Sequence, residues 1–455
     1  MAEPGKSNPL ATLRQKAVAA HRAGELDAAQ MHYVGYLSRS PGDAGLWSNL
    51  GALFRTMGEP EQAIRAHMRA YAISPNAPGV RGNYANALSD IGRYQEALVL
   101  RHEILRAQPD DVQQKALIGR ALRGMGDYDA SIDFLQASHV THPDDAEIEL
   151  QLAFSMLGAG EYEAGFRHYQ SRWRTGEMKS VKVPYPRWAG EDLKGKTVLV
   201  MPEQGFGDAV LMMRFLPELK ERGATVVCLT EKPMTRLFAQ VPGADVVAHQ
   251  IKPSDDIDYF IPLMDLPLLG LKNPGDIPPP TRLSVPEDSS ERAREIVQPY
   301  KSEFRIGVVW TGSTTYKGNA FRSFTHREFL PLAEIPEVQL FSLYKGPMLE
   351  QFHADGSGAF LIDAGSSDRD FADCAAMMQA MDLIITSDTA TAHIGGSLGI
   401  PTWVVLHWDP FWVYRHDGMT TPWYPSMRLF RQQSPLCWED VFDEVRAALE
   451  EEIEG

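Results

Sequence analysis

The sequence is poor in cysteine, in clustered basic residues and in long apolar runs. Its three cysteines, Cys228, Cys374 and Cys437, are too few and too widely spaced for a disulfide framework or a cysteine-based metal site, and they suit a reducing compartment. Lys and Arg number 44 against 60 Asp and Glu, a net charge of −16. No basic block stands apart, which argues against nucleic acid binding. No apolar run approaches the length of a membrane span, and the N-terminal stretch lacks the apolar core of a secretory signal. These absences predict a cytoplasmic protein of several domains.

The first third of the chain is an internal repeat. Pro41, Pro75, Pro109 and Pro143 are 34 residues apart, the period of the tetratricopeptide repeat, and glycines keep the same interval from Gly24 to Gly160. Small residues let the two helices of a repeat approach closely, glycine permits the turn between them, and proline ends the second helix. We therefore predict an all-α solenoid over residues 10–173, with four full repeats and a partial fifth.

A solenoid of this kind has a concave groove that usually binds a peptide or a protein helix. Asn49, Asn83 and Asn86 fall on the first helices of their repeats and are candidates for clamping a peptide backbone. Two plainer interpretations remain open. The asparagines could be solvated surface residues, and the solenoid could serve only to pack against the rest of the chain or a second copy.

The remaining two thirds alternate short apolar strands with helical segments. After a polar linker over 174–195, strands are expected at 197–201, 225–230, 245–248 and 258–263, and a second set at 305–310, 338–344, 360–363, 382–388 and 402–406. This alternation predicts two Rossmann-like α/β domains with parallel sheets, over 196–300 and over 301–455, the latter closing on a C-terminal helix. The fold class is α + α/β, and ligands should bind at the carboxyl ends of the strands.

The first loop with possible chemistry is Pro202–Asp208, between a strand and a helix. Gln204, Gly205 and Gly207 form an expected acceptor loop, in which the glycines allow a tight turn and close backbone approach. The dinucleotide fingerprint would need a small residue at Val210, so NAD or FAD binding is disfavoured. Asp208 stands at the expected helix start. Spacing alone favours a helix N-cap over a general base.

The second loop is the strand-to-helix junction at Ser387, Asp388 and Thr389. Free N–H groups and the positive end of a helix dipole there favour a diphosphate, to which Thr389 can add a hydroxyl bond. Asp388 would repel phosphate but suits a ribose hydroxyl or a backbone amide. His393 follows Thr389 by one helical turn, and by itself it is better explained as a packing histidine.

The third loop follows the first strand of the second half. Thr311, Gly312 and Ser313 could donate to phosphate, and Lys317 and Arg322 could neutralise it, although two stray cations on a surface loop would look the same. Tyr344 and Lys345 end the next strand on the same side. For a metal, the one candidate motif is Asp256–Ile–Asp258, which is better explained as two surface carboxylates. No zinc spacing, P-loop or nucleophile elbow is present, so no metal or cofactor is expected.

These loops together resemble the GT-B glycosyltransferases of the heptosyltransferase-like superfamily, over about residues 190–435. The resemblance rests on Gly207–Asp208, on WTGS with RSF, on SDTATAHIGGSLGIPTWVVL and on the late segment TPWYPSMRLFRQ. With the repeats in front, the whole chain resembles bacterial tetratricopeptide-glycosyltransferase fusions, some of which modify flagellin or other proteins. The family commonly has glycine where this chain has Ala390, a difference that could alter donor choice.

The resemblance implies an inverting, metal-independent transfer from a nucleotide-sugar donor. It implies a catalytic role for Asp208, against the odds from spacing alone, and nucleotide contacts at Thr311, Gly312, Asp388, Thr389 and His393. An acidic chain suits a protein acceptor, held by the solenoid, better than a lipopolysaccharide. The alternatives are a non-catalytic adaptor with a degenerate GT-B module and a lipopolysaccharide- or saccharide-directed enzyme; an epimerase on the same fold is less favoured. The sequence does not identify the donor, the acceptor or the oligomeric state.

Overall fold

The computed structural model describes residues 9–176, 183–203, 205–252, 256–314, 316 and 318–454. The chain divides into two compact units, Met1–Gln151 and Leu152–Gly455. The first unit is helical and the second contains two parallel sheets, which confirms the α + α/β fold class. The division falls inside one helix of the fifth repeat, so the end of the repeat region belongs to the unit that contains the sheets.

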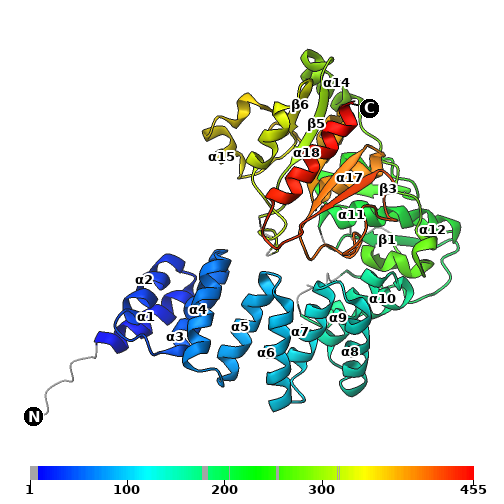
Figure 1. Cartoon of the computed structure of the whole chain (residues 1–455). Helices are drawn as coiled ribbons and strands as arrows, with labels where there is room; N and C mark the ends of the chain where they lie inside the picture. Colours follow the sequence, from blue (N-terminus) through cyan, green and yellow to red (C-terminus); the bar gives the residue numbers. More distant parts are fainter. Residues whose placement is uncertain are drawn as a thin grey trace, which may run out of the picture. The chain divides into compact units, whose positions relative to one another are not determined.

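The first unit is a series of antiparallel helical pairs, which Figure 1 shows in blue to cyan. The helices are α1 (Pro9–Ala23), α2 (Leu26–Leu37), α3 (Ala44–Met57), α4 (Pro60–Ile73), α5 (Pro78–Asp90), α6 (Tyr94–Ala107), α7 (Val112–Gly124) and α8 (Tyr128–Thr141), followed by α9 (Ala146–Ala159), which continues into the second unit. Small and apolar side chains pack the helices together: Ala85 and Leu88 of α5 and Ala97 of α6 share one core cluster with Ile64 of α4, in the preceding pair.

The repeat geometry follows from the residues that recur every 34 positions. Gly24, Gly58, Gly92, Gly126 and Gly160 all have φ between 72° and 90°. Since side chains disfavour that left-handed conformation, the turn within each repeat requires glycine. Asp43 and Asp111 recur at the other end of the repeat and accept the backbone N–H of the residue three positions later, at 2.9 and 3.0 Å. These caps fix where the first helix of a repeat begins.

The second unit begins with the end of the fifth repeat, α10 (Tyr162–His168) and the 3-10 helix η1 (Tyr169–Trp173). The aromatic ring of Tyr162 packs against Trp412 and Trp423, and its hydroxyl accepts the indole N–H of Trp423 at 3.0 Å. Gly160 likewise faces Pro274. Side chains of the α/β region therefore cover the end of the fifth repeat.

The first sheet has the order β3-β2-β1-β4, and all its strand pairs are parallel. Its strands are β1 (Thr197–Met201), β2 (Thr225–Leu229), β3 (Val246–Ala248) and β4 (Tyr259–Pro262). The connecting helices are α11 (Phe206–Met212), η2 (Met213–Phe215), α12 (Leu216–Glu221), η3 (Lys232–Met234), α13 (Thr235–Phe238), η4 (Leu263–Leu269) and η5 (Pro274–Asp276).

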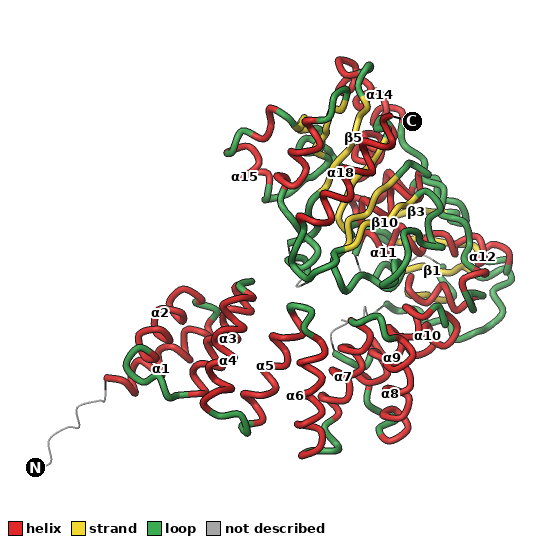
Figure 2. The backbone as a smooth tube through the Cα atoms, in the orientation of Figure 1, coloured by secondary structure: helices red, strands yellow, loops and turns green. Residues whose placement is uncertain are grey.

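The second sheet has the order β10-β9-β8-β5-β6-β7 and is also parallel throughout. Figure 2 shows the strands of the sheets in yellow among the red helices. Its strands are β5 (Phe304–Val309), β6 (Val338–Ser342), β7 (Leu361–Asp363), β8 (Leu383–Ser387), β9 (Thr402–Leu406) and β10 (Met427–Arg431). The helices are α14 (Glu287–Val297), η6 (Gln298–Tyr300), η7 (His326–Glu334), α15 (Leu349–Ala354), η8 (Ser357–Ala359), α16 (Phe371–Gln379), α17 (Ala390–Leu398) and α18 (Glu439–Glu454).

Two elements differ from the sequence expectation. The helical stretch expected from Asp208 begins two residues earlier, at Phe206, and is broken into α11, η2 and α12. Pro217 stands in the first turn of α12, where the missing N–H is tolerated, and it cannot continue a helix from upstream. The strand β10 was not expected, since no regular alternation sets Met427–Arg431 apart from the polar residues around it.

Candidate functional site

Asp208 lies on α11, directly after the loop that follows β1. The N-cap of α11 is Gly205, whose backbone is extended, so Asp208 is the third residue of the helix and not its cap. Its Oδ2 atom accepts the N–H of Gly205 at 3.2 Å. The carboxylate thus satisfies a free helix N–H from within the first turn. Gln204, expected in this loop, lies outside the described residues.

Helix α11 of the first sheet region packs against α17 of the second. Gly207 allows the contact: a Cβ atom there would lie 2.8 Å from Cδ2 of His393 and 3.5 Å from Cα of Ala390. Any larger residue would push the two helices apart. The glycine before Asp208 therefore brings the start of α11 against the first turns of α17, as expected for the carboxyl ends of strands β1 and β8 facing one another.

The junction from β8 to α17 is a buried set of hydroxyl groups. Thr389 is the N-cap of α17. The hydroxyl of Thr391 lies 2.7 Å from those of both Thr386 and Thr389. The Oγ atom of Ser387 is fully buried and has no hydrogen-bond partner among the described residues. A buried hydroxyl without a partner carries a free-energy cost, which a ligand at this helix start would relieve.

The loop after β5 reaches the same junction. A Cβ atom on Gly312 would lie 2.9 Å from Cγ2 of Thr389 and 3.0 Å from Nη2 of Arg322. Asn319 holds the loop, because its side chain accepts the Gly312 N–H at 3.2 Å and donates to the Thr311 hydroxyl at 2.9 Å. The predicted residues Thr311, Gly312 and Arg322 therefore meet Thr389.

The other predicted residues of this region behave differently. Lys317 lies outside the described residues, and Ser313 belongs to the same loop as Gly312. Tyr344 packs its ring on Trp310, with 4.9 Å between ring centroids, and Lys345 donates to the backbone carbonyl of Asp368. These two contacts involve neither α11 nor α17.

Charge at the junction is dominated by two carboxyl groups and one guanidinium. Burial raises the pKa of Asp208 to about 7; the Gly205 N–H and Arg322 oppose the shift, while Asp388 and Glu203 add to it. Burial also raises the pKa of Asp388, against the attraction of Arg322. Asp208, whose pKa is raised by burial and by the Asp388 charge, can therefore hold and release a proton near neutral pH.

His393 is a neutral, buried ring at the α11–α17 contact. Its Nδ1 atom lies 3.2 Å from the hydroxyl of Tyr424, and its ring stacks on Tyr414. Burial lowers the pKa of His393 to about 3, with a further contribution from Arg214 and Arg322. The ring therefore acts as an uncharged hydrogen-bonding and packing group.

Several residues of this site were not expected from the sequence. Arg214 is buried, donates to the Trp423 carbonyl at 2.9 Å and lies over the ring of Tyr424. Tyr414 is fully buried beside His393, and its pKa is raised well above the usual value by burial and by Asp388. Asn319 was also not expected; its side-chain amide holds the loop after β5. None is marked by a local motif: Arg214 and Tyr414 reach the site through contacts distant in sequence, and Asn319 acts within its own loop.

Carboxylates expected at the surface have structural partners. Asp258 precedes β4 and accepts from Lys196 Nζ at 2.9 Å and from the Thr197 N–H at 2.8 Å. It therefore joins the amino ends of β1 and β4, at the sheet edge opposite the junction described above. Asp256, its neighbour in the Asp-x-Asp motif, is exposed.

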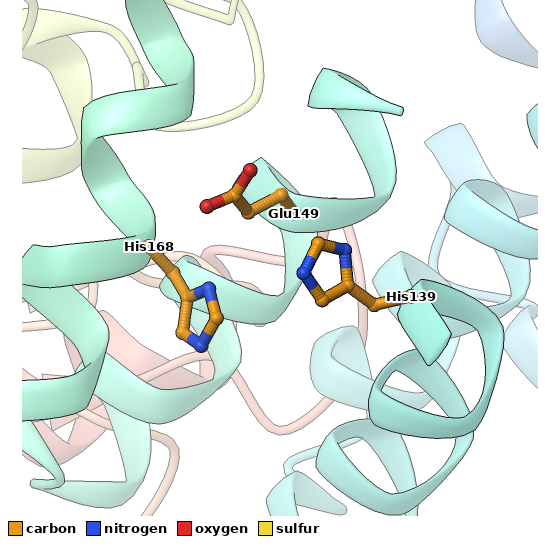
Figure 3. Close-up of side chains that lie close together, drawn as sticks. All are labelled: His139, Glu149 and His168. Carbon is orange, nitrogen blue, oxygen red and sulfur yellow. The ribbon is translucent and has the colours of Figure 1, made fainter. Parts of the chain in front are cut away.

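The groove asparagines lie on first helices as expected, Asn49 on α3 and the other two on α5. The side chain of Asn83 donates to the Ser48 hydroxyl at 2.9 Å, and that of Asn86 accepts from Arg101 at 2.9 Å. Both amides thus also brace helix contacts within the first unit. Figure 3 shows a further set of side chains, His139 on α8, Glu149 on α9 and His168 on α10. Its members belong to different units, and no role is assigned to them.

Comparison with known proteins identifies the family of the repeats and a longer relative. The tetratricopeptide repeat family model matches residues 54–121. Protein FlbA of Caulobacter vibrioides (strain ATCC 19089 / CIP 103742 / CB 15) is 27% identical over 314 residues, which cover 63% of this chain and 52% of FlbA. The chain thus spans about half the length of that relative.

Two solved structures match a smaller part of the chain. MamA (residues 41 to the end) from Desulfovibrio magneticus RS-1 is 16% identical with a TM-score of 0.34, covering 38% of this chain and 99% of that one. A tetratricopeptide repeat protein from Parabacteroides merdae ATCC 43184 is also 16% identical, with a TM-score of 0.33, covering 37% and 67%. The family match by itself shows that the chain contains a tetratricopeptide repeat region, a structural class used for protein–protein contacts. Among the described helices, none has the length and apolar character needed to cross a membrane.

Proposed function

We propose that this protein is a glycosyltransferase that moves a sugar from a nucleotide-sugar donor to an acceptor hydroxyl. The observation that carries the proposal is that α11, which carries Asp208, packs through Gly207 on the first turn of α17, with Asp388 and Arg322 close enough to act on the pKa of Asp208. A proton acceptor with a pKa near 7 thus stands opposite a helix start suited to a diphosphate. The resemblance to heptosyltransferase-like enzymes assigns the same roles to the two sides.

The donor diphosphate would lie at the start of α17. The N–H groups of that turn and the hydroxyls of Ser387 and Thr389 would donate to its oxygens, and Arg322 would offset its charge. Asp388 would accept a ribose hydroxyl, because a carboxylate repels phosphate. Such a site needs no metal ion, since the leaving group is stabilised by protein donors.

Asp208 would act as the general base. The acceptor oxygen attacks the anomeric carbon, its proton passes to Asp208, and the bond between that carbon and the diphosphate oxygen breaks. The nucleoside diphosphate leaves with the electron pair. Attack from the side opposite the leaving group inverts the anomeric configuration. A pKa of about 7 suits this step, because the carboxylate is then basic enough to take a hydroxyl proton yet still ionised in half the molecules at pH 7.

The repeat region would recruit the acceptor, which we propose is a protein. Solenoids of this class bind extended peptides or helices, and Asn49, Asn83 and Asn86 lie on the first helices of their repeats. The rival function is a protein-binding adaptor in which the α/β region has no activity. The raised pKa of Asp208 beside Asp388 and Arg322 favours the transferase, because an adaptor has no use for a buried carboxyl group that titrates near pH 7.

The test compares Asp208→Asn with Asp256→Asn, which changes an exposed carboxylate in the same way. Nucleotide sugars that raise the melting temperature of the native chain identify the donor, and transfer or hydrolysis is then followed by release of nucleoside diphosphate. Asp208→Asn should lower turnover about a hundredfold or more while donor affinity stays within about threefold. Asp256→Asn should match the native chain. Equal loss of turnover and donor binding in Asp208→Asn contradicts the role of general base, and indifference of the native chain to every donor favours the adaptor.

A further inference from the structure

A buried ion-pair cluster joins the end of the repeat region to the loop that carries Asp208. Arg172, on η1, binds Glu203 with both arms of its guanidinium, Nε to Oε2 at 2.9 Å and Nη2 to Oε1 at 3.0 Å. Its Nη2 atom also donates to Oδ1 of Asp265, on η4, at 2.7 Å. The side chains of Arg172 and Glu203 are each 2% exposed, and that of Asp265 is 9% exposed. We name these three residues the Arg172 cluster.

The cluster is satisfied on every side. Gln170 donates to Asp265 at 2.7 Å, and Arg187 bonds both Gln170 and Asp265. Burial by itself would lower the pKa of Arg172, but its bonds to Glu203 and the attraction of Asp265 outweigh that and raise it. Arg172 therefore stays charged in a buried site, which is stable only while its carboxylate partners are in place.

The cluster also holds the start of the loop before α11. Glu203 follows β1 and Pro202, and its Oε1 atom also accepts the N–H of Met264 at 2.9 Å. Two residues further on, Gly205 donates its N–H to Asp208. Helix η4, which contributes Asp265 and Met264, packs against both α10 and α11. The position of Asp208 is thus tied to Arg172 through Glu203, within a stretch of six residues.

We propose that Arg172 is a positioning residue for the transfer reaction: by gripping Glu203 it fixes the loop that aims Asp208 and screens Asp208 from the Glu203 charge. This inference rests on the proposed function. It also gives the end of the repeat region a part in the reaction. The 3-10 helix η1 completes the fifth repeat, and its Arg172 holds the loop before α11, the helix that carries the base. Electrostatics supports the link, since Glu203 is among the groups that raise the pKa of Asp208.

Activity tests the positioning role with a matched pair of substitutions in the full chain. Arg172→Lys keeps the charge and loses the two-armed grip on Glu203, whereas Arg187→Lys makes the same change on the other arginine that binds Asp265. We expect Arg172→Lys to lower kcat about tenfold with donor KM within about threefold, because the base is misplaced and the donor site is not. Arg187→Lys should stay within about twofold of the native chain. Equal effects of the two substitutions on kcat overturn the proposal.

A second measurement needs no turnover and remains informative where Arg172→Lys unfolds. Melting temperatures of the native chain, Asp208→Asn, Glu203→Gln and the double variant are compared at pH 5.5 and 8.5. Removing the Glu203 charge should lower the pKa of Asp208 by about 0.5 unit or more. Asp208→Asn should raise the melting temperature more at pH 8.5 than at pH 5.5. This difference should be smaller when the chain also carries Glu203→Gln.

The outcomes separate the two proposals. An identical pH-dependent gain in both backgrounds shows that Glu203 does not act on Asp208 and overturns the role of Arg172. A reduced gain, with no transfer from any donor by the native chain, keeps the link between Glu203 and Asp208 and refutes the proposed function instead.

Discussion

At the scale of single residues, Asp208 makes a testable contribution to stability. Its pKa of about 7 in the folded chain lies above the value of about 3.9 expected when unfolded. Below pH 4 both states are protonated and the group is neutral to stability. As pH rises from 4 to 7 only the unfolded state releases the proton, so the folded state loses stability, and the loss is complete above pH 7.

Asp208→Asn should therefore stabilise the chain by about 3–4 kcal/mol more at pH 8 than at pH 4, because an amide has no charge to bury. Urea unfolding at the two pH values measures the difference. The exposed Asp256→Asn is the control and should show no such dependence. A gain for Asp208→Asn that is the same at both pH values contradicts the raised pKa.

His67 is a second buried residue whose surroundings do not suit its polar atoms. Its ring is fully buried, neither ring nitrogen has a partner in the described part of the chain, and burial lowers its pKa to about 4. Two repeats later the same position is Leu135, and both side chains lie against a glycine, Gly51 and Gly119. The repeat geometry therefore accepts leucine at this place.

His67→Leu should stabilise the chain by about 1–2 kcal/mol at pH 8, since two unsatisfied nitrogens are removed from the core. A histidine whose folded pKa is lowered gives stability that is present above its unfolded pKa of about 6.5 and lost as pH falls towards 4. His67→Leu should lack that acid-dependent loss. Urea unfolding between pH 8 and 4 tests both points, with exposed His249→Leu as control; a destabilised variant at pH 8 would refute the packing argument.

Individual residues also show which parts of the site could be predicted from the sequence. The meeting of Gly312, Arg322 and Thr389 was predicted, because all three follow the carboxyl ends of neighbouring parallel strands. The position of Asp208 was predicted only in part, since spacing suggested an N-cap and the extended Gly205 takes that place. Arg214 and Tyr414 were missed, because contacts that form only when distant elements pack together leave no periodic or motif signal.

At the scale of elements, the contact between α11 and α17 sets the geometry of the site. It depends on Gly207, because a Cβ atom there would lie 2.8 Å from the His393 ring, which is itself held by Tyr424. Gly207→Ala should destabilise the chain by about 1–3 kcal/mol and lower transferase turnover, as the helices separate. Thermal unfolding measures this. Gly270→Ala, where an added Cβ meets nothing within 4 Å, is the control; equal melting temperatures for the two variants contradict the packing claim.

Elements were predicted well where their pattern is strong. The 34-residue period placed every repeat, because the positive-φ glycines and the prolines are obligatory at their positions. The buried strands from β1 to β9 were found as apolar, β-branched runs. The helix after β1 was predicted as one piece and is three, since Pro217 interrupts it, a break that hydrophobic periodicity alone does not reveal.

At the scale of the whole molecule, the boundary between repeat and α/β regions is not where the repeat pattern stops. The pattern runs to Trp173, yet α10 and η1 belong to the unit that holds both sheets. Tyr162 occupies the repeat position of Tyr94 and Tyr128, but its ring packs on Trp412 and Trp423. Sequence periodicity identifies the repeat and not its neighbour, so this junction could be found only in three dimensions.

The central claim is that a diphosphate binds at the start of α17 opposite Asp208. Calorimetric titration of nucleoside diphosphates against the native chain, Arg322→Met and Asp208→Asn tests it most directly. The claim predicts that the native chain binds one nucleoside diphosphate, that Arg322→Met weakens binding about tenfold or more, and that Asp208→Asn binds at least as tightly as the native chain, because it removes a negative charge. Binding that is indifferent to Arg322, or absent for every nucleotide, would contradict it.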